Sequence, residues 1–183
     1  MPKVLVPLAN GFEETEAVTI IDILRRAEVT VTVASLNGEP VTGNHHITIT
    51  PDIDLDSALA GDFDLVALPG GMPGADNLEK DPRIEELLVK MAATGKFVAA
   101  ICAAPKVLKA AGLLDDREAT SFPGFIDKDP AKGMRYSTEA VVQDGKVVTS
   151  RGPGTAMDFA LKLAEILVGK EKRDEVEARL QRP

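Results

Sequence analysis

The sequence predicts an α/β protein with an open, mostly parallel sheet and helices on both faces. Short apolar runs alternate with segments of helical periodicity along nearly all of its 183 residues. Strands separated by helices of about 10–15 residues are typical of parallel crossover connections. The pair Asp144-Gly145, flanked by two apolar runs, indicates one antiparallel hairpin. No repeat or linker interrupts this pattern, so we expect a single domain over residues 1–183.

The strands are predicted from buried apolar runs and, over residues 29–34, from a strict alternation of Val with Thr. The residues 69–71, Pro-Gly-Gly, close one of these runs and favour a turn. The expected strands are residues 3–7, 29–34, 64–68, 97–101, the hairpin pair 140–142 and 146–149, and a short ribbon of 41–42 with 47–50.

The helices are predicted from apolar residues at helical spacing and from their start and stop residues. Pro82 stands at the first position of one helix, where its missing N–H costs nothing. Gly112 and Gly169 are typical of positions just past a helix C-terminus. The expected helices are residues 13–27, 81–94, 105–111, 153–168 and 171–180.

Composition and charge exclude several classes of function. The chain has 21 Lys and Arg against 29 Asp and Glu, and its net charge of −8 disfavours nucleic acid or an anionic membrane as a partner. No apolar run approaches the roughly 20 residues that span a bilayer. The chain enters its first strand at Val4 with no signal-peptide pattern, so we expect a cytoplasmic protein. One Cys and two His leave few metal ligands, and we expect neither a metal nor a cofactor.

Cys102 is the only strong nucleophile of the chain, and it lies where a buried strand meets a helix. The small residues Ala100 and Ala104, two positions before and after it, permit the sharp turn of a nucleophile elbow. We expect a strained backbone at Cys102 and an exposed sulfur at the helix N-terminus. There the helix dipole and free N–H groups would favour the thiolate. The alternative is a buried structural Cys that packs like a small hydrophobe.

Other unusual residues follow the carboxyl ends of the predicted strands, where open α/β sheets bind ligands. The Gly-rich residues 69–74 could supply an oxyanion-hole N–H beside that of Ala103, or could simply form a turn that needs Gly. One of Glu13, Glu14 and Glu16, buried beside Cys102, would be held protonated and could hydrogen-bond to the thiolate. Acids in a first helical turn also complement the helix dipole, and spacing alone does not choose among the three.

Two further kinds of side chain are candidates for this site. His45 and His46 are the only imidazoles that could partner Cys102, although as neighbours on a short ribbon they are also typical of exposed side chains. Arg151, between Ser150 and Gly152, could bind an anion or pair with an acid, or form an ordinary surface salt bridge.

Four segments, residues 11–17, 68–71, 99–105 and 149–155, resemble the DJ-one/ThiJ/PfpI family. The similarity covers essentially the whole chain in order. It is closest to the branch of the parkinsonism-associated protein and its bacterial relatives. The resemblance implies a flavodoxin-like fold and a homodimer.

The resemblance also implies roles for individual residues. Cys102 would be the nucleophile and Glu16 its protonated partner, with the N–H groups of Gly71 and Ala103 around the sulfur or an oxyanion. The candidates for the surrounding pocket are Gly70, His45, Phe122 and Arg151.

The chain departs from the family pattern at several positions. Phe122 stands where some members carry a His near the pocket, and His45 where some carry an Arg from the dimer partner. The peripheral cysteines of animal members are absent. Ala103 replaces the His that follows the nucleophile in PfpI-type proteases, which argues against a cysteine peptidase. No His follows His46, so the His-x-Glu of class I glutamine amidotransferases is missing.

The resemblance implies a cofactor-free enzyme that acts on small reactive carbonyls. It would convert methylglyoxal to lactate in the manner of a glyoxalase III, with possible deglycase activity and a link to oxidative stress. Without a His near the thiol, we expect weak turnover. The alternative is a redox sensor or chaperone, because a single thiol with no resolving partner would stop at sulfenate or sulfinate.

Overall fold

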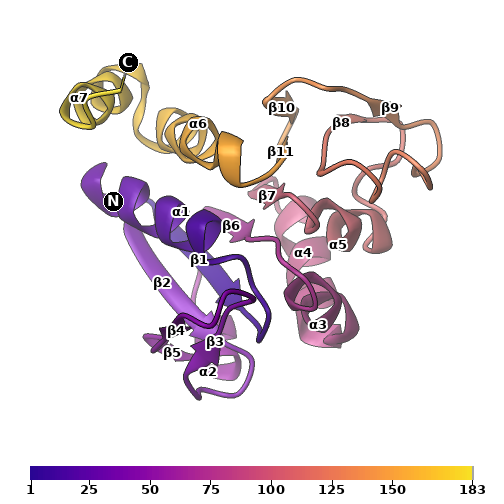
Figure 1. The fold of residues 1–183 in the computed structure, drawn as a ribbon, viewed down its shortest axis with the longest axis horizontal. Helices are drawn as coiled ribbons and strands as arrows, with labels where there is room; N and C mark the ends of the chain where they lie inside the picture. The colour runs from indigo at the N-terminus through magenta and orange to yellow at the C-terminus, as the bar shows by residue number, and fades with distance from the viewer. Residues whose placement is uncertain (183) are drawn as a thin grey trace.

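The computed structural model describes residues 1–182 and is built around one seven-stranded sheet (Figure 1). All its neighbouring strands pair in parallel except the β10–β11 hairpin. The strand order is β10 (Val141–Asp144), β11 (Val147–Ser150), β7 (Phe97–Ile101), β6 (Leu65–Leu68), β1 (Lys3–Leu8), β2 (Thr30–Ser35) and β5 (Ile53–Asp54).

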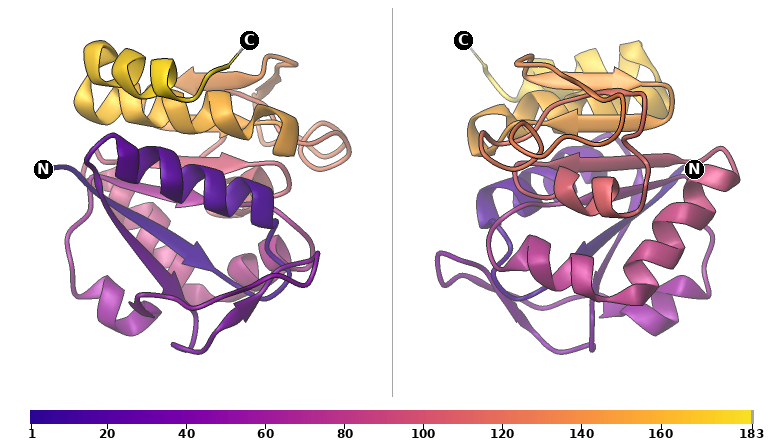
Figure 2. Two further views of the ribbon diagram at one scale, coloured as in Figure 1. Left: turned by 60° about the vertical axis from the view of Figure 1, so that its left-hand side comes forward. Right: turned by 90° about the vertical axis from the view of Figure 1, so that its right-hand side faces the viewer.

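Helices cover both faces of this sheet, as the sequence predicts (Figures 1 and 2). One face carries α1 (Glu14–Arg26) and α6 (Ala156–Val168), with α7 (Lys170–Arg179) packed on α6. The helices of the other face are α2 (Leu55–Leu59), α3 (Gly74–Lys80), α4 (Pro82–Ala93) and α5 (Pro105–Ala110).

The central strand β1 shows why its apolar run is continuous. Val4, Val6 and Leu8 are fully buried in the core beneath α1 and α6, whereas Leu5 is fully buried in the core on the other face. A strand covered on both sides needs apolar residues at every position. The predicted strand over residues 3–7 is therefore confirmed, with one more residue at its end.

The long elements predicted from the sequence are present, and several short ones were missed. Residues 153–168 begin with a 3₁₀ turn, Pro153–Thr155, before α6. The expected ribbon forms only over β3 (Val41–Thr42) and β4 (Thr48–Ile49), so His45 and His46 lie in its turn rather than on a strand. The missed elements are α2, α3, β5 and the parallel pair β8 (Glu118–Ala119) and β9 (Arg135–Tyr136). Strands of two residues are too short for a periodicity to show.

The topology gathers four strand ends at one edge of the sheet. The chain passes from β1 through α1 to β2 on one side, whereas β6 pairs on the other side of β1. This reversal is the switch point at which open α/β sheets bind ligands. The carboxyl ends of β1, β6, β7 and β11 all open there. Among the described helices, none has the length and apolar character needed to cross a membrane.

Candidate active site

The turn between β7 and α5 has the geometry of a nucleophile elbow. Cys102 follows the last residue of β7 directly and adopts a φ of 64°, in the left-handed region that non-Gly residues rarely occupy. Its N–H donates to the Ser150 carbonyl at 3.0 Å, and its carbonyl accepts from the Phe122 N–H at 2.9 Å. Three backbone segments therefore hold the turn, and the predicted strain at Cys102 is confirmed.

The predicted exposure of the sulfur is wrong, because the whole residue is only 9% exposed. The Gly-rich loop after β6 covers it. A Cβ placed on Gly70 would lie 2.6 Å from the Cys102 Cβ and 2.8 Å from Glu16 Oε2. Only a glycine allows these two side chains to approach each other across the loop.

Glu16 is the acid that lies beside Cys102, which the spacing of the three acids could not decide. It stands in the first turn of α1 and is fully buried. Its Oε2 accepts the Gly70 N–H at 2.7 Å, and its carboxyl interacts with the Cys102 thiol. Glu13 caps the helix by accepting the Glu16 N–H at 2.8 Å, so the helix start fixes where Glu16 points.

Two backbone N–H groups, those of Gly71 and Ala103, lie close enough to the Cys102 sulfur to lower the pKa of its thiol. They come from the loops that follow β6 and β7, which the parallel register places side by side. A hydrogen-bond donor favours the charged form of the group it reaches. The same two donors are placed to stabilise an oxyanion that develops next to the sulfur.

Burial shifts the titration of both side chains in the same direction. It raises the pKa of Glu16 to about 7, and the charge of Glu13 adds to this rise. It raises the pKa of the Cys102 thiol to about 12, with a further rise from the Glu16 charge and a decrease from the Gly71 and Ala103 N–H groups. The expectation that the elbow alone lowers the thiol pKa is therefore wrong.

The two groups consequently hold at most one negative charge between them near neutral pH, since a second charge in the same buried space is strongly disfavoured. When Glu16 holds the proton, the charge that opposes ionisation of Cys102 is gone while the two N–H donors remain. The thiolate therefore forms in the state in which Glu16 is the acid.

Glu14 has a structural partner that the sequence analysis missed. It is buried, and its Oε1 accepts the N–H groups of His45 at 2.7 Å and Ile47 at 3.2 Å. Its Oε2 lies 3.1 Å from His45 Nδ1. These hydrogen bonds hold the pKa of Glu14 below its usual range despite its burial. His45 thus contacts the acids at the start of α1, and its side chain is 69% exposed.

Phe122 and Arg151 are the remaining residues that were expected around the pocket. Phe122 reaches the elbow through its backbone N–H, and its half-exposed ring packs edge-on against Phe125 with centroids 6.4 Å apart. Arg151 follows Ser150, and its Nη1 donates to the Thr138 carbonyl at 3.4 Å. Within residues 1–182 it forms no ion pair, so neither the acid partner nor the salt bridge considered for it is present.

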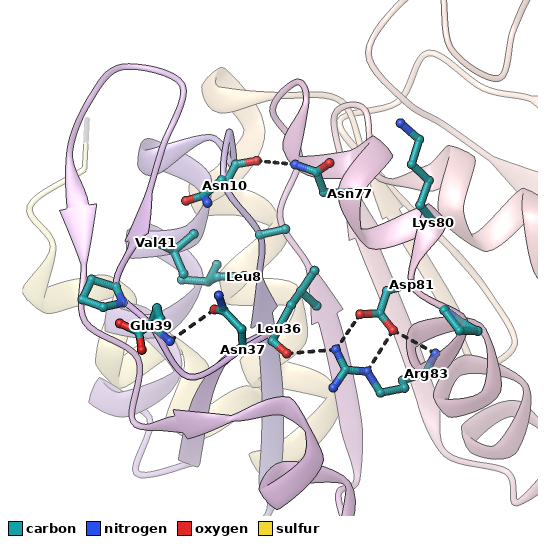
Figure 3. Close-up of a pocket in the computed structure, with 13 residues that line it drawn as sticks. Leu8, Asn10, Leu36, Asn37, Glu39, Val41, Asn77, Lys80, Asp81 and Arg83 are labelled. Atoms are coloured by element: carbon teal, nitrogen blue, oxygen red, sulfur yellow. Dashed lines mark hydrogen bonds and ion pairs between the residues drawn. The ribbon is translucent and has the colours of Figure 1, made fainter.

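A separate cavity of about 700 Å³ lies beyond β1 and β2, next to the junction of α3 and α4 (Figure 3). Its wall combines apolar side chains with polar ones: Asn77 donates to the Asn10 carbonyl at 2.9 Å, and Arg83 pairs with Asp81 at 2.6 Å. Neither Cys102 nor Glu16 lines it. The thiol chemistry therefore belongs to the compact site at the elbow and not to this larger hollow.

Comparison with known proteins agrees with the geometry. The family model described as DJ-1/PfpI matches residues 2–166. The chain belongs to the DJ-1/PfpI family. This confirms the resemblance and, with the observed sheet, the flavodoxin-like prediction.

Three family members illustrate the similarity. "Parkinson disease protein 7 homolog" of Danio rerio is 44% identical over 181 residues, covering 97% of this chain and 96% of that protein. "Glutathione-independent glyoxalase DJR-1.2" of Caenorhabditis elegans is 38% identical over 169 residues, covering 92% of this chain and 89% of that protein. The solved structure described as "Toxoplasma gondii DJ-1, oxidized" has a TM-score of 0.93 at 41% identity and covers 98% of both chains.

Burial of Glu16 predicts a pH-dependent stability. The pKa of Glu16 is raised from 4.5 to about 7 in the folded state, so folding binds a proton in this range and the free energy of unfolding falls as pH rises through it. The shift corresponds to about 3 kcal/mol. Glu16→Gln removes this contribution, so we expect the stability difference between variant and wild type to change by about that amount from pH 4.5 to 7.5. Urea unfolding at several pH values measures it, and parallel pH profiles would contradict the assignment.

The close approach at Gly70 predicts a sharp difference between two glycine substitutions. Gly70→Ala places a methyl group against Cys102, Glu16 and the Ile101 carbonyl, so we expect a loss of about 1–3 kcal/mol in unfolding free energy. Gly154→Ala is the control, because nothing lies within 4 Å of its added Cβ. It should change stability by less than about 0.5 kcal/mol. Equal urea midpoints for the two variants would show that the loop does not pack as described.

Proposed function

We propose that this protein converts methylglyoxal to lactate without a cofactor, with Cys102 as nucleophile and Glu16 as proton carrier. The observation that carries the proposal is the buried Glu16 carboxyl, whose pKa of about 7 lets it accept and donate a proton near neutrality. The similarity to the C. elegans protein named a glutathione-independent glyoxalase supports the same activity.

The first step joins the substrate to the enzyme. The Cys102 thiolate attacks the aldehyde carbon C1, and the carbonyl electron pair moves to the aldehyde oxygen. The Gly71 and Ala103 N–H groups stabilise that oxygen as its charge develops. Glu16 then gives its proton to the oxygen, which leaves a neutral hemithioacetal and an ionised carboxylate.

The second step moves a proton between two carbons. The Glu16 carboxylate removes the hydrogen from C1, the released electron pair forms the C1–C2 double bond, and the C2 carbonyl pair moves to its oxygen. The C1 hydroxyl proton passes to that C2 oxygen, which leaves an enediolate with its charge on the C1 oxygen. Glu16 returns its proton to C2 as the C1 oxygen forms the thioester carbonyl, so that C2 carries a hydroxyl. Water then cleaves the sulfur–C1 bond to release lactate and the Cys102 thiol. The sum is methylglyoxal plus water to lactate, with no external oxidant or reductant.

The same thiol would attack other carbonyl adducts that reach it. The proposal therefore includes deglycation of proteins or nucleotides. The low exposure of Cys102, 9%, favours a substrate of a few atoms over a bulky one. Turnover is expected to be weak, because within the described residues neither His contacts Cys102 to help the proton transfers.

We also propose that the protein acts as a homodimer in the cytoplasm. Three large apolar side chains are exposed on the segments that build the site: Val18 on α1, Ile47 beside Glu14, and Met72 after Gly71. Large exposed apolar side chains on neighbouring segments support a surface that another chain covers. A free nucleophilic thiol requires a reducing compartment, which favours the cytoplasm.

A second candidate function is redox sensing or chaperone activity through oxidation of Cys102. It is favoured by the single thiol, which has no resolving partner in the sequence, and by the similarity to a structure described as oxidized. Two N–H donors and a protonated Glu16 would hydrogen-bond sulfinate oxygens as readily as an oxyanion. Lactate production separates this candidate from the first, because a sensor needs no turnover.

Substitution of the two reacting groups should stop lactate formation. Cys102→Ser is expected to abolish it, since a hydroxyl titrates far above neutrality and no His lies beside it to act as its base. Glu16→Gln should reduce kcat/KM by about 10²–10⁴-fold, the usual range for loss of general acid–base help. His46→Ala, in an exposed turn, should keep wild-type activity. Enzymatic detection of lactate measures the rates, and wild-type production by Cys102→Ser would refute the proposal.

Thiol reactivity and turnover should change in opposite directions in Glu16→Gln. The substitution removes the charge that raises the pKa of Cys102 but keeps the Gly71 and Ala103 donors. We expect iodoacetamide to label Cys102 faster at pH 7 in this variant than in wild type, although lactate formation is lost. Intact mass against time gives the rate of single labelling. Slower labelling in the variant would show that Glu16 assists the thiolate as a donor more than its charge opposes it.

A further inference from the structure

Three side chains at the start of α1 and in the β3–β4 turn bring potential metal ligands together. Glu13, Glu14 and His45 each offer one donor atom, and all three atoms lie within 4.8 Å of one another. His45 Nδ1 is 3.1 Å from Glu14 Oε2 and 3.6 Å from Glu13 Oε1. Donor atoms that bind one ion at about 2.0–2.2 Å stand at comparable separations from each other.

The charge of this cluster is not balanced by other side chains. The Glu13 and Glu14 side chains are only 9% and 5% exposed. Within residues 1–182, neither carboxyl forms an ion pair with Lys or Arg, and His45 is their only side-chain partner of opposite charge. Buried carboxylates are normally paired with a cation or coordinate a metal. Two of them here share one imidazole that is charged only when protonated.

Glu13 Oε1 is the atom that lacks a partner. The other oxygen of the same carboxyl, Oε2, accepts the Glu16 N–H. No hydrogen bond reaches Oε1 in the described residues, and the atom faces His45 Nδ1 beyond hydrogen-bond distance. Glu14 is fixed instead, because two backbone N–H groups hold its Oε1 and leave Oε2 turned to the imidazole. One ligand is therefore preorganised and a second has an oxygen without a hydrogen bond in the described residues, and both lie near the third.

We propose that Glu13, Glu14 and His45 bind a divalent transition-metal ion of the zinc type, with water completing the coordination. A mixed set of one imidazole and two carboxylates suits Zn²⁺, whereas Mg²⁺ prefers oxygen ligands alone. His45 would bind through Nδ1 and carry its proton on Nε2. In the single chain its ring is 69% exposed. The ligands come from segments that are far apart in the sequence, so no ligand-spacing motif predicts this site.

The proposed ion site is separate from the reacting groups and does not depend on the proposed function. Its link to them is the hydrogen bond from the Glu16 N–H to Glu13. A zinc ion could instead bind to the Cys102 thiolate, which is the competing location. The simplest alternative without a metal is a clamp in which His45 donates to Glu14 and holds the β3–β4 turn against α1.

Isothermal titration with Zn²⁺ and with Mg²⁺ distinguishes these cases. The proteins are the wild type, Cys102→Ser, Glu13→Gln, His45→Ala and the matched control His46→Ala. We expect one Zn²⁺ per chain in the wild type, Cys102→Ser and His46→Ala, and no comparable Mg²⁺ binding. Removal of a residue that only hydrogen-bonds to a metal ligand weakens metal binding by about 10–100-fold. His45 is itself a ligand in this proposal, so His45→Ala should weaken Zn²⁺ binding by at least about 100-fold. Circular dichroism confirms that each variant is folded.

Cobalt provides an independent readout of the ligands. Co²⁺ bound to the cluster should show visible bands without thiolate-to-metal charge transfer, and the spectrum should be the same in Cys102→Ser. Zinc binding that is lost in Cys102→Ser but kept in His45→Ala would overturn the proposal in favour of the thiol. Absence of zinc binding in the folded wild type would overturn it in favour of the clamp.

Discussion

The contact between the Glu16 carboxyl and the Cys102 thiol across Gly70 is the constraint on which the rest of the site depends. Two ionisable groups that share a buried space can hold only one negative charge at neutral pH. Every neighbouring feature either permits that contact or decides where the charge resides. Gly70 permits it by having no side chain, and its N–H holds one carboxyl oxygen. The strained turn brings the thiol to the same point.

The site differs from a thiol–imidazole pair in how its nucleophile is activated. An imidazole removes the proton of a thiol and leaves an ion pair, which stabilises the thiolate by charge. Here the neighbour is itself an acid, so activation requires the proton to move onto a carboxyl whose pKa burial has raised to about 7. The two backbone donors then stabilise the sulfur without a counter-charge. Such a site places beside a weakly ionised thiol a carboxyl whose pKa would let it give and take protons near neutrality.

Much of the fold and part of the site could be predicted from the sequence, for identifiable physical reasons. β7 was predicted with its observed bounds, because a strand buried on both faces shows as an unbroken apolar run. The elbow was predicted because small residues flank Cys102. The exposure and pKa of the thiol were predicted wrongly, since both depend on the loop that folds over it from β6. No sequence pattern within residues 99–105 indicates that contact.

The three acids at the start of α1 show most clearly where sequence reasoning ends. They share one residue type and one helical turn, and the helix dipole accounts for all three equally well. In the structure Glu13 caps the helix, Glu14 holds the β3–β4 turn, and Glu16 meets the thiol. The difference arises from the partner of each acid. Glu13 contacts the backbone of its own first turn, Glu14 contacts the β3–β4 turn some 30 residues further along the chain, and Glu16 contacts the loop after β6. What packs against each acid, and not the acids themselves, therefore makes one of them a helix cap, one a support for the β3–β4 turn and one the neighbour of the thiol.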